Sequence, residues 1–159
     1  MHLLRDWRRT IRRLFSTELK IEMRKNPNVI TLLGGVGYSF YEPDNKQIIN
    51  CEAAEQAMVD IAVGLALSDK IPFVYAITPH LFRAFEGIRI YLDYYKIPVK
   101  LVGIGRGRDF DNLGFTHWGE GDMQIMSNFP NIETFWPIEE DQMKVLLKRM
   151  IEEPKPFYM

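Results

Sequence analysis

Apolar and polar positions follow one another in blocks that predict strands and helices in turn. Runs of apolar and β-branched residues at 29–33, 72–77 and 99–104 are typical of strands that are buried on both faces. Residues 52–68 and 80–96 carry apolar side chains every three or four positions, which predicts helices. We therefore expect an α/β fold with a mostly parallel central sheet and helices on both faces.

The last third of the chain continues this alternation after a long loop. Residues 105–119 are rich in glycine and show no apolar period, so we expect a loop of the kind that often carries function. A short helix over 120–128, a strand over 132–136, a helix over 139–152 and a final strand from residue 157 follow. Ligands of such sheets bind beyond the carboxyl ends of the strands.

The first 26 residues predict a basic amphipathic helix. Residues 1–25 hold eight Lys or Arg against three Asp or Glu, which leaves twelve against eighteen in the rest of the chain. Three uses fit this pattern: a first helix of the fold with a solvated arginine face, a helix that binds an anionic or membrane surface, or a mitochondrial targeting segment. Asp6, Glu18 and Glu22 fit a targeting segment poorly, so the first use is favoured.

Length and composition exclude several classes of protein. A chain of 159 residues with 47% hydrophobic residues and a net charge of −1 is typical of one soluble domain, here residues 1–159. It has no apolar run long enough to span a membrane, and its near-zero charge argues against nucleic acid as the main partner. One cysteine and three scattered histidines supply neither a disulfide framework nor a metal cluster, so we expect no metal on this chain and a cytoplasmic location.

Three segments in this order resemble a known family. The segments are 49–58 (INCEAAEQAM) continued by 62–66 (AVGLA), 83–89 (RAFEGIR), and 113–117 (LGFTH) followed by Pro130-Asn131. Together they are similar to the pyrimidine-binding (Pyr) domain of the transketolase family of thiamine diphosphate enzymes, in its transketolase and deoxyxylulose-phosphate-synthase branches. The resemblance runs from about residue 5 to residue 159 and implies the thiamine diphosphate-binding fold.

The resemblance implies a catalytic and cofactor-binding role for Glu55. In this family, a glutamate at the start of a helix hydrogen-bonds a ring nitrogen of the aminopyrimidine and drives it to the imino form that deprotonates the thiazolium carbon. A carboxyl group in an apolar cleft favours its neutral form and can share a proton with such a nitrogen. Without the motif, Glu55 is interpreted as a surface glutamate of the helix, or as a first-turn residue favoured by the helix dipole, a role that Glu52 fits well.

His117 matches the family histidine that faces the substrate and stabilises oxygens of the donor sugar, so the resemblance implies a catalytic and substrate-binding role. Histidine suits this role because it can donate a hydrogen bond, or change its charge, near neutral pH. The alternative is a loop histidine bonded to the backbone. Arg106 and Arg108 are candidates for binding a sugar phosphate in a bidentate manner, and solvated loop charges are the equal alternative.

Two further cofactor-binding positions are implied by the resemblance. The family sandwiches the pyrimidine ring between aromatic side chains, and counting back from Arg89 places Ile77 and His80 there. This chain thus offers an aliphatic side chain and an imidazole in place of two phenyl rings. We expect stacking to be weaker by on the order of 1 kcal/mol.

The motif that binds the diphosphate is missing. The family holds it through Mg²⁺ with Gly-Asp-Gly and a later asparagine, whereas Gly121-Asp122 is followed here by Met123. The resemblance therefore implies thiamine diphosphate shared with a separate diphosphate-binding (PP-type) subunit, with Mg²⁺ on that partner. We expect a dimer or an assembly of two copies of each chain, and no activity from this chain alone.

These expectations define one leading hypothesis and one rival. The leading hypothesis is the pyrimidine-binding subunit of a split transketolase-like enzyme that transfers a two-carbon ketol or acyl unit, with Glu55 activating the cofactor. The rival is a noncatalytic binding or regulatory module that kept the fold and lost cofactor use, which the replacement of both stacking rings favours.

Overall fold

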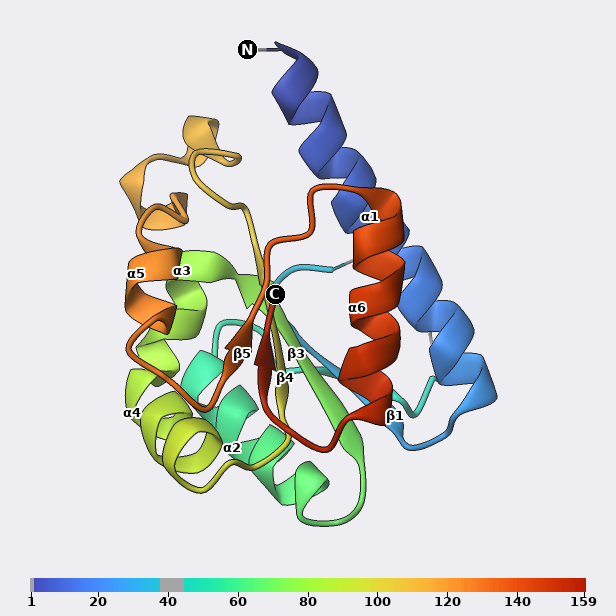
Figure 1. The fold of residues 1–159 in the computed structure, drawn as a ribbon. Coiled ribbons are helices and arrows are strands. Elements are labelled where there is room, and N and C mark those ends of the chain that lie inside the picture. The colour runs from blue at the N-terminus through green and yellow to red at the C-terminus, as the bar shows by residue number, and fades with distance from the viewer. Residues whose placement is uncertain (1, 38–44) are drawn as a thin grey trace.

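The fold is given by a computed structural model that describes residues 2–37 and 45–159. Within these residues, one six-stranded sheet is flanked by helices (Figure 1). The strands are β1 (Val29–Gly34), β2 (Ile48–Asn50), β3 (Ile71–Ile77), β4 (Lys100–Ile104), β5 (Glu133–Thr134) and β6 (Phe157–Tyr158). The α-helices of five or more residues are α1 (His2–Lys25), α2 (Glu55–Ala66), α5 (Asp122–Met126) and α6 (Glu140–Glu152). No helix in this part of the chain has the length and apolar character needed to cross a bilayer.

The sheet is parallel throughout the described chain. Its strand order is β2-β1-β3-β4-β6-β5, and each neighbouring pair runs in the same direction. Because parallel neighbours need a crossover between them, helices or long loops connect the strands. The α/β fold with a parallel sheet that the sequence predicts is confirmed, and the carboxyl ends of β1, β3 and β4 lie side by side.

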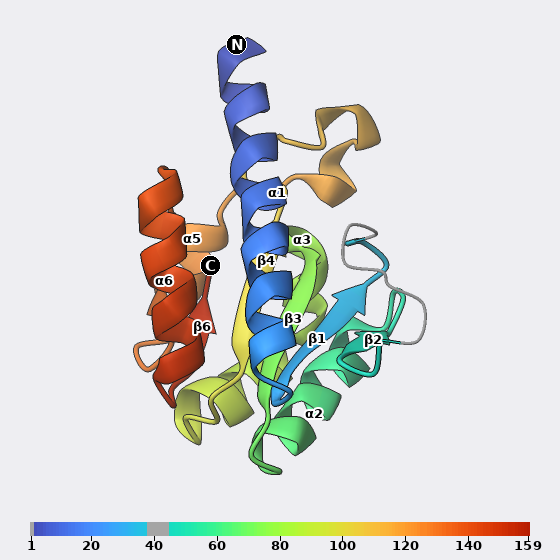
Figure 2. The same cartoon turned by 90° about the vertical axis from the view of Figure 1, so that its right-hand side faces the viewer.

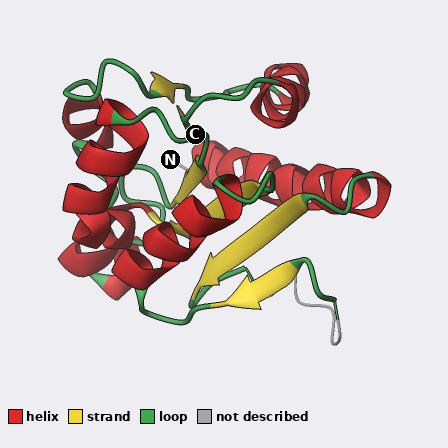
Figure 3. Cartoon of the chain, turned by 90° about the horizontal axis from the view of Figure 1, so that it is seen from below, coloured by secondary structure: helices red, strands yellow, loops and turns green. Residues whose placement is uncertain are grey.

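Helices cover both faces of the sheet, as expected. Figure 2 shows α1 across one face with α6 beside it, and Figure 3 shows the sheet and its helices from below. Alternate residues of β3 point to opposite layers. Tyr75 stacks on Phe15 of α1 with 6.1 Å between ring centroids, whereas Val74 packs in the cluster that contains Met58 of α2. This alternation decides which side chains reach the site below.

The helix expected over residues 80–96 is wound unevenly. It begins as α3 (Thr78–Leu81), with Pro79 in its first turn, where the missing N–H costs no bond. It continues as a 3₁₀ turn and α4 (Phe85–Gly87), and then widens into a π-helical segment, η2 (Ile88–Tyr94). Along this segment Ala84 is buried, while Phe85 is 44% exposed.

The loop after β4 is held against itself by short backbone contacts. Gly119 donates its N–H to the carbonyl oxygen of Gly107 at 2.7 Å, and Gly119 pairs with both Arg106 and Gly107 as isolated bridges. Two 3₁₀ turns, η3 (Asp111–Leu113) and η4 (Phe115–His117), lie inside this closure. The glycine-rich segment expected to be a long loop is thus an ordered one that carries His117.

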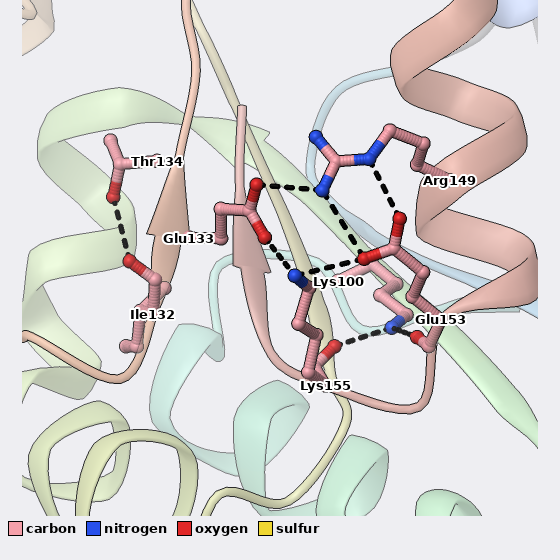
Figure 4. Close-up of polar contacts among 7 residues, drawn as sticks. All are labelled: Lys100, Ile132, Glu133, Thr134, Arg149, Glu153 and Lys155. Carbon is pink, nitrogen blue, oxygen red and sulfur yellow. Dashed lines mark hydrogen bonds and ion pairs between the residues drawn. The ribbon is translucent and has the colours of Figure 1, made fainter.

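A charged cluster joins α6 to the two outer strands at the opposite end of the sheet (Figure 4). Arg149 binds Glu133 at 2.7 Å and Glu153 at 2.7 Å, and Lys155 pairs with both carboxylates. Beneath them Lys100 is 1% exposed, and its Nζ donates to the carbonyl oxygen of Glu153 at 2.8 Å and to that of Lys155. Lys100 therefore ties β4 to the end of α6.

Lys100 should make the stability of the fold depend on pH. Burial lowers the pKa of Lys100 to about 7, against the opposing charge of Glu153. An unfolded lysine releases its proton near pH 10.4, so between these values the unfolded chain binds a proton that the folded chain lacks. The free energy of unfolding should then rise with pH, by about 2 kcal/mol between pH 7 and 9. A neutral amine keeps two N–H donors for the two carbonyls.

This dependence can be measured by urea unfolding at pH 7, 8 and 9. Lys100→Met should lose the rise, whereas Lys148→Met, which removes a lysine that is 72% exposed on α6, should keep it. If wild type and Lys100→Met change in parallel over this range, Lys100 is charged in the fold and the expectation is wrong.

Candidate functional site

The candidate site lies where three connections leave the carboxyl ends of parallel strands of the sheet. Glu55 is the first residue of α2, which follows β2, while His80 lies in α3 directly after β3. His117 ends η4 in the loop after β4. Because the strands are parallel, these three connections emerge at one edge of the sheet, and their side chains approach one another there.

Glu55 is the buried acid of this group. Its side chain is 1% exposed, and Oε2 accepts a hydrogen bond from Nη1 of Arg83 at 3.0 Å. Oε1 is also buried but has no hydrogen-bond partner among the described residues, and Nδ1 of His80 lies 3.7 Å from it. A buried carboxylate oxygen without a partner is costly, so Oε1 marks a place where a donor is missing.

His80 stands between Glu55 and His117. Its side chain is 16% exposed, and its ring meets that of His117 edge to face, with centroids 4.9 Å apart. Burial and the nearby Arg83 guanidinium lower the pKa of His80, while the Glu55 carboxylate acts in the opposite direction. The imidazole is therefore neutral at pH 7 and presents an uncharged ring beside the carboxylate.

His117 is half-buried on the outer side of this group. Its Nδ1 lies 2.9 Å from the hydroxyl oxygen of Thr116, and the backbone of Thr116 also hydrogen-bonds His80. The loop after β4 is thereby fastened to α3, which keeps the two imidazoles together. The arrangement combines a buried acid, a neutral ring and a second imidazole, which suits proton transfer to a ring nitrogen and hydrogen bonding to a nearby substrate oxygen.

The family of this chain follows from comparison with known proteins. The model of the transketolase pyrimidine-binding domain matches residues 8–159, nearly the whole sequence. The chain belongs to this family. The resemblance carried by the three sequence segments is confirmed.

Similar proteins include single subunits of divided transketolases. One subunit of the apulose-4-phosphate transketolase from Phocaeicola vulgatus is 33% identical over 116 residues, covering 71% of this chain and 36% of the relative. The 1-deoxy-D-xylulose-5-phosphate synthase of Corynebacterium glutamicum is 32% identical over 143 residues, covering 87% of this chain and 22% of the relative. The chain spans about a third of the length of the transketolase subunits it matches.

Solved structures agree with the fold. A split-gene transketolase in an inactive β4 tetramer superposes with a TM-score of 0.79 and 28% identity, covering 93% of this chain and 49% of the other. A transketolase mutant from Pichia stipitis gives a TM-score of 0.80 at 17% identity, covering 92% of this chain and 24% of the other, which speaks for the fold alone.

The group around Glu55 does not include Ile77. Ile77 is the last residue of β3 and is 6% exposed in the apolar cluster with Phe15 and Tyr75, under α1 and α6. Glu55 and His80 lie at the start of helices on the opposite layer. Of the two positions expected to stack on a pyrimidine ring, only His80 is brought to Glu55.

Arg106 and Arg108 make their described contacts outside the group around Glu55. Arg108 donates to Glu120 at 2.7 Å and lies over the ring of Trp118 at 4.1 Å. Arg106 lies over Trp136 at 5.5 Å and lines a cavity of about 110 Å³ between α1 and the end of β4. Their expected role in binding a sugar phosphate stays a prediction.

Arg83 is the residue of this site to which sequence reasoning gave no role. It belongs to the 83–89 segment that carries the family resemblance, but only the structure shows its contact with Glu55. A usable signal was present, because Arg83 follows His80 by three residues, and residues at this spacing share one side of a helical turn.

Proposed function

We propose that this chain is the pyrimidine-binding subunit of a two-subunit, transketolase-like enzyme that transfers a two-carbon ketol or acyl unit. The observation that carries the proposal is Oε1 of Glu55, a buried carboxylate oxygen that lacks a partner among the described residues and borders a neutral imidazole. Such an atom fits the ring nitrogen of an aminopyrimidine, which supplies the missing polar partner. Membership of the transketolase family and the relatives from divided transketolases support the same interpretation.

The cofactor implied is thiamine diphosphate, and Glu55 and His80 would hold its pyrimidine end. When bound, it supplies a thiazolium carbon that is acidic enough to lose a proton and attack a carbonyl group. Glu55 would hold and release a proton at the ring nitrogen through Oε1. His80, being neutral and largely buried, would cover one face of the ring and exclude water from the carboxylate.

His117 would act on the donor substrate. Its ring is held by Thr116 and by contact with His80, so its position relative to Glu55 is fixed before substrate arrives. From the outer side of the group it would donate a hydrogen bond to an oxygen of the donor sugar. We assign no residue to the acceptor substrate.

A partner chain is part of the proposal. The diphosphate and its Mg²⁺ would be bound by a separate polypeptide with the Gly-Asp-Gly motif, and two copies of each chain would form the enzyme. The isolated chain is then expected to be inactive. The similar split-gene transketolase, an inactive β4 tetramer, supports this expectation.

The proposal is tested by calorimetric titration with thiamine diphosphate and Mg²⁺. The samples are this chain alone, a candidate partner encoded beside it, and their mixture, with each sample also assayed for ketol transfer from a panel of ketose phosphates. We expect heat of binding and turnover from the mixture, and turnover from neither chain alone. A complex that forms but gives no heat of binding would instead identify this chain as a noncatalytic module of the same fold.

A further inference from the structure

The two oxygens of the Glu55 carboxylate lie in unlike surroundings. Oε2 accepts the only hydrogen bond that the described residues give this group, from Nη1 of Arg83 at 3.0 Å. Oε1 is buried and unpaired, with Nδ1 of His80 at 3.7 Å, beyond hydrogen-bond distance. One oxygen is therefore used within the chain, and the other has no hydrogen-bond partner among the described residues.

Arg83 reaches this carboxylate from the solvent side. It lies in η1 (Phe82–Ala84), directly after α3, and its side chain is 54% exposed whereas that of Glu55 is 1% exposed. The guanidinium is planar and permanently charged, so the direction of its N–H groups sets the plane of the carboxylate that accepts from it. Because most of Arg83 is outside the core, its contact with Glu55 is not a by-product of core packing.

We propose that Arg83 is a positioning residue for Glu55, an inference that rests on the proposed function. By holding Oε2, Arg83 fixes the rotamer of the side chain and keeps Oε1 directed at the pyrimidine position. Its charge also offsets the cost of burying a carboxylate before the cofactor arrives. Arg83 thus acts through Glu55, and a change at Arg83 should alter how well the carboxylate works more than how tightly the cofactor binds.

The experiment compares Arg83→Met, Arg83→Lys and Arg89→Met in the complex with the partner. Arg89 is an exposed arginine six residues further along and serves as the matched control. Calorimetry gives the affinity for thiamine diphosphate, and acid-quenched NMR gives the rate at which the C2 hydrogen of bound cofactor exchanges with deuterium. In the chain alone, the Glu55 carboxyl ¹³C resonance reports the contact without cofactor.

We expect Arg83→Met to slow C2 exchange by about 10- to 100-fold with little loss of affinity, because a small displacement of a catalytic group costs this much. Arg83→Lys should recover part of the rate, since it restores a donor and a charge, and Arg89→Met should match wild type. The Glu55 resonance should move in Arg83→Met and not in Arg89→Met.

The outcomes separate this inference from the one on which it rests. Wild-type exchange rates in Arg83→Met, or a parallel loss of affinity and exchange, would overturn the positioning role and leave the proposed function intact. A wild-type complex that neither binds the cofactor nor exchanges its C2 hydrogen would overturn both. If Arg83→Met does not fold, Arg83→Lys decides, because full wild-type exchange or an unshifted Glu55 resonance there counts against a role for guanidinium geometry.

Discussion

Glu55→Gln should lower the C2 exchange rate of bound thiamine diphosphate by about 10²- to 10⁴-fold, the usual contribution of a positioned proton-transfer group. Glutamine keeps the length of the side chain and one oxygen for Arg83, but it cannot hold or release a proton at Oε1. The fold should tolerate the change, because the side chain keeps its size and its acceptor for Arg83. The rate is measured by acid-quenched NMR in the complex with the partner, and turnover should fall with it.

Glu52→Gln is the matched control for this prediction. Glu52 lies three residues earlier, is exposed, and accepts a hydrogen bond from Nδ2 of Asn50 at 2.6 Å. Its replacement should leave exchange at the wild-type rate, since it removes the same charge outside the buried group. A Glu55→Gln complex that exchanges within a few-fold of wild type would remove Glu55 from the mechanism.

The order of strands and helices was predictable because strands that are buried on both faces consist of continuous runs of apolar residues. Val29–Gly34 and Ile71–Ile77 are such runs and form the longest strand pairing of the sheet. The segment after β3 was predicted as one regular helix. The spacing of apolar residues indicates that a segment is helical, but it does not distinguish α-helical from 3₁₀- or π-helical turns. Pro79 set its start, but the 3₁₀ and π-helical turns depend on packing against α2, which a periodicity does not encode.

The sequence also did not show to which face of the sheet Ile77 points. Counting along the family pattern put Ile77 and His80 together, but successive strand residues alternate, and Ile77 shares its face with Phe73 and Tyr75. Both faces of β3 are apolar, so the sequence holds no polar position that tells one face from the other. This alternation does not apply to His80, because His80 lies beyond the strand, in α3.

The pairing of Glu55 with Arg83 was harder to predict for a different reason. The two residues are 28 positions apart, and their contact depends on how α2 and η1 pack above neighbouring strand ends. The family resemblance selected Glu55 and His117 as candidates, and the structure brings both to His80. The contact of Arg83 with Glu55, and the lack of a hydrogen-bond partner for Oε1, are seen only in the structure.

Gly119→Ala should destabilise the loop that carries His117. A Cβ at this position would lie 2.7 Å from the carbonyl oxygen of Gly105 and 3.2 Å from Cβ of Thr78. The nearest atom is backbone rather than a flexible side-chain end, so the loop has to move. We expect the free energy of unfolding to fall by about 1–3 kcal/mol, measured by urea unfolding of the chain alone.

Gly64→Ala makes the same chemical change but should alter the free energy of unfolding in the opposite direction. Gly64 lies inside α2, and no atom lies within 4 Å of the Cβ that alanine would add. Alanine there should raise the free energy of unfolding by about 0.4–1 kcal/mol through the lower entropy of the unfolded chain.

The two variants should also differ in their effect on the candidate site, because a displaced Gly119 shifts the loop that fastens His117 to His80. The histidine ring resonances should therefore move in Gly119→Ala and stay in place in Gly64→Ala, and equal spectra in both variants would show that the closure of this loop does not position His117.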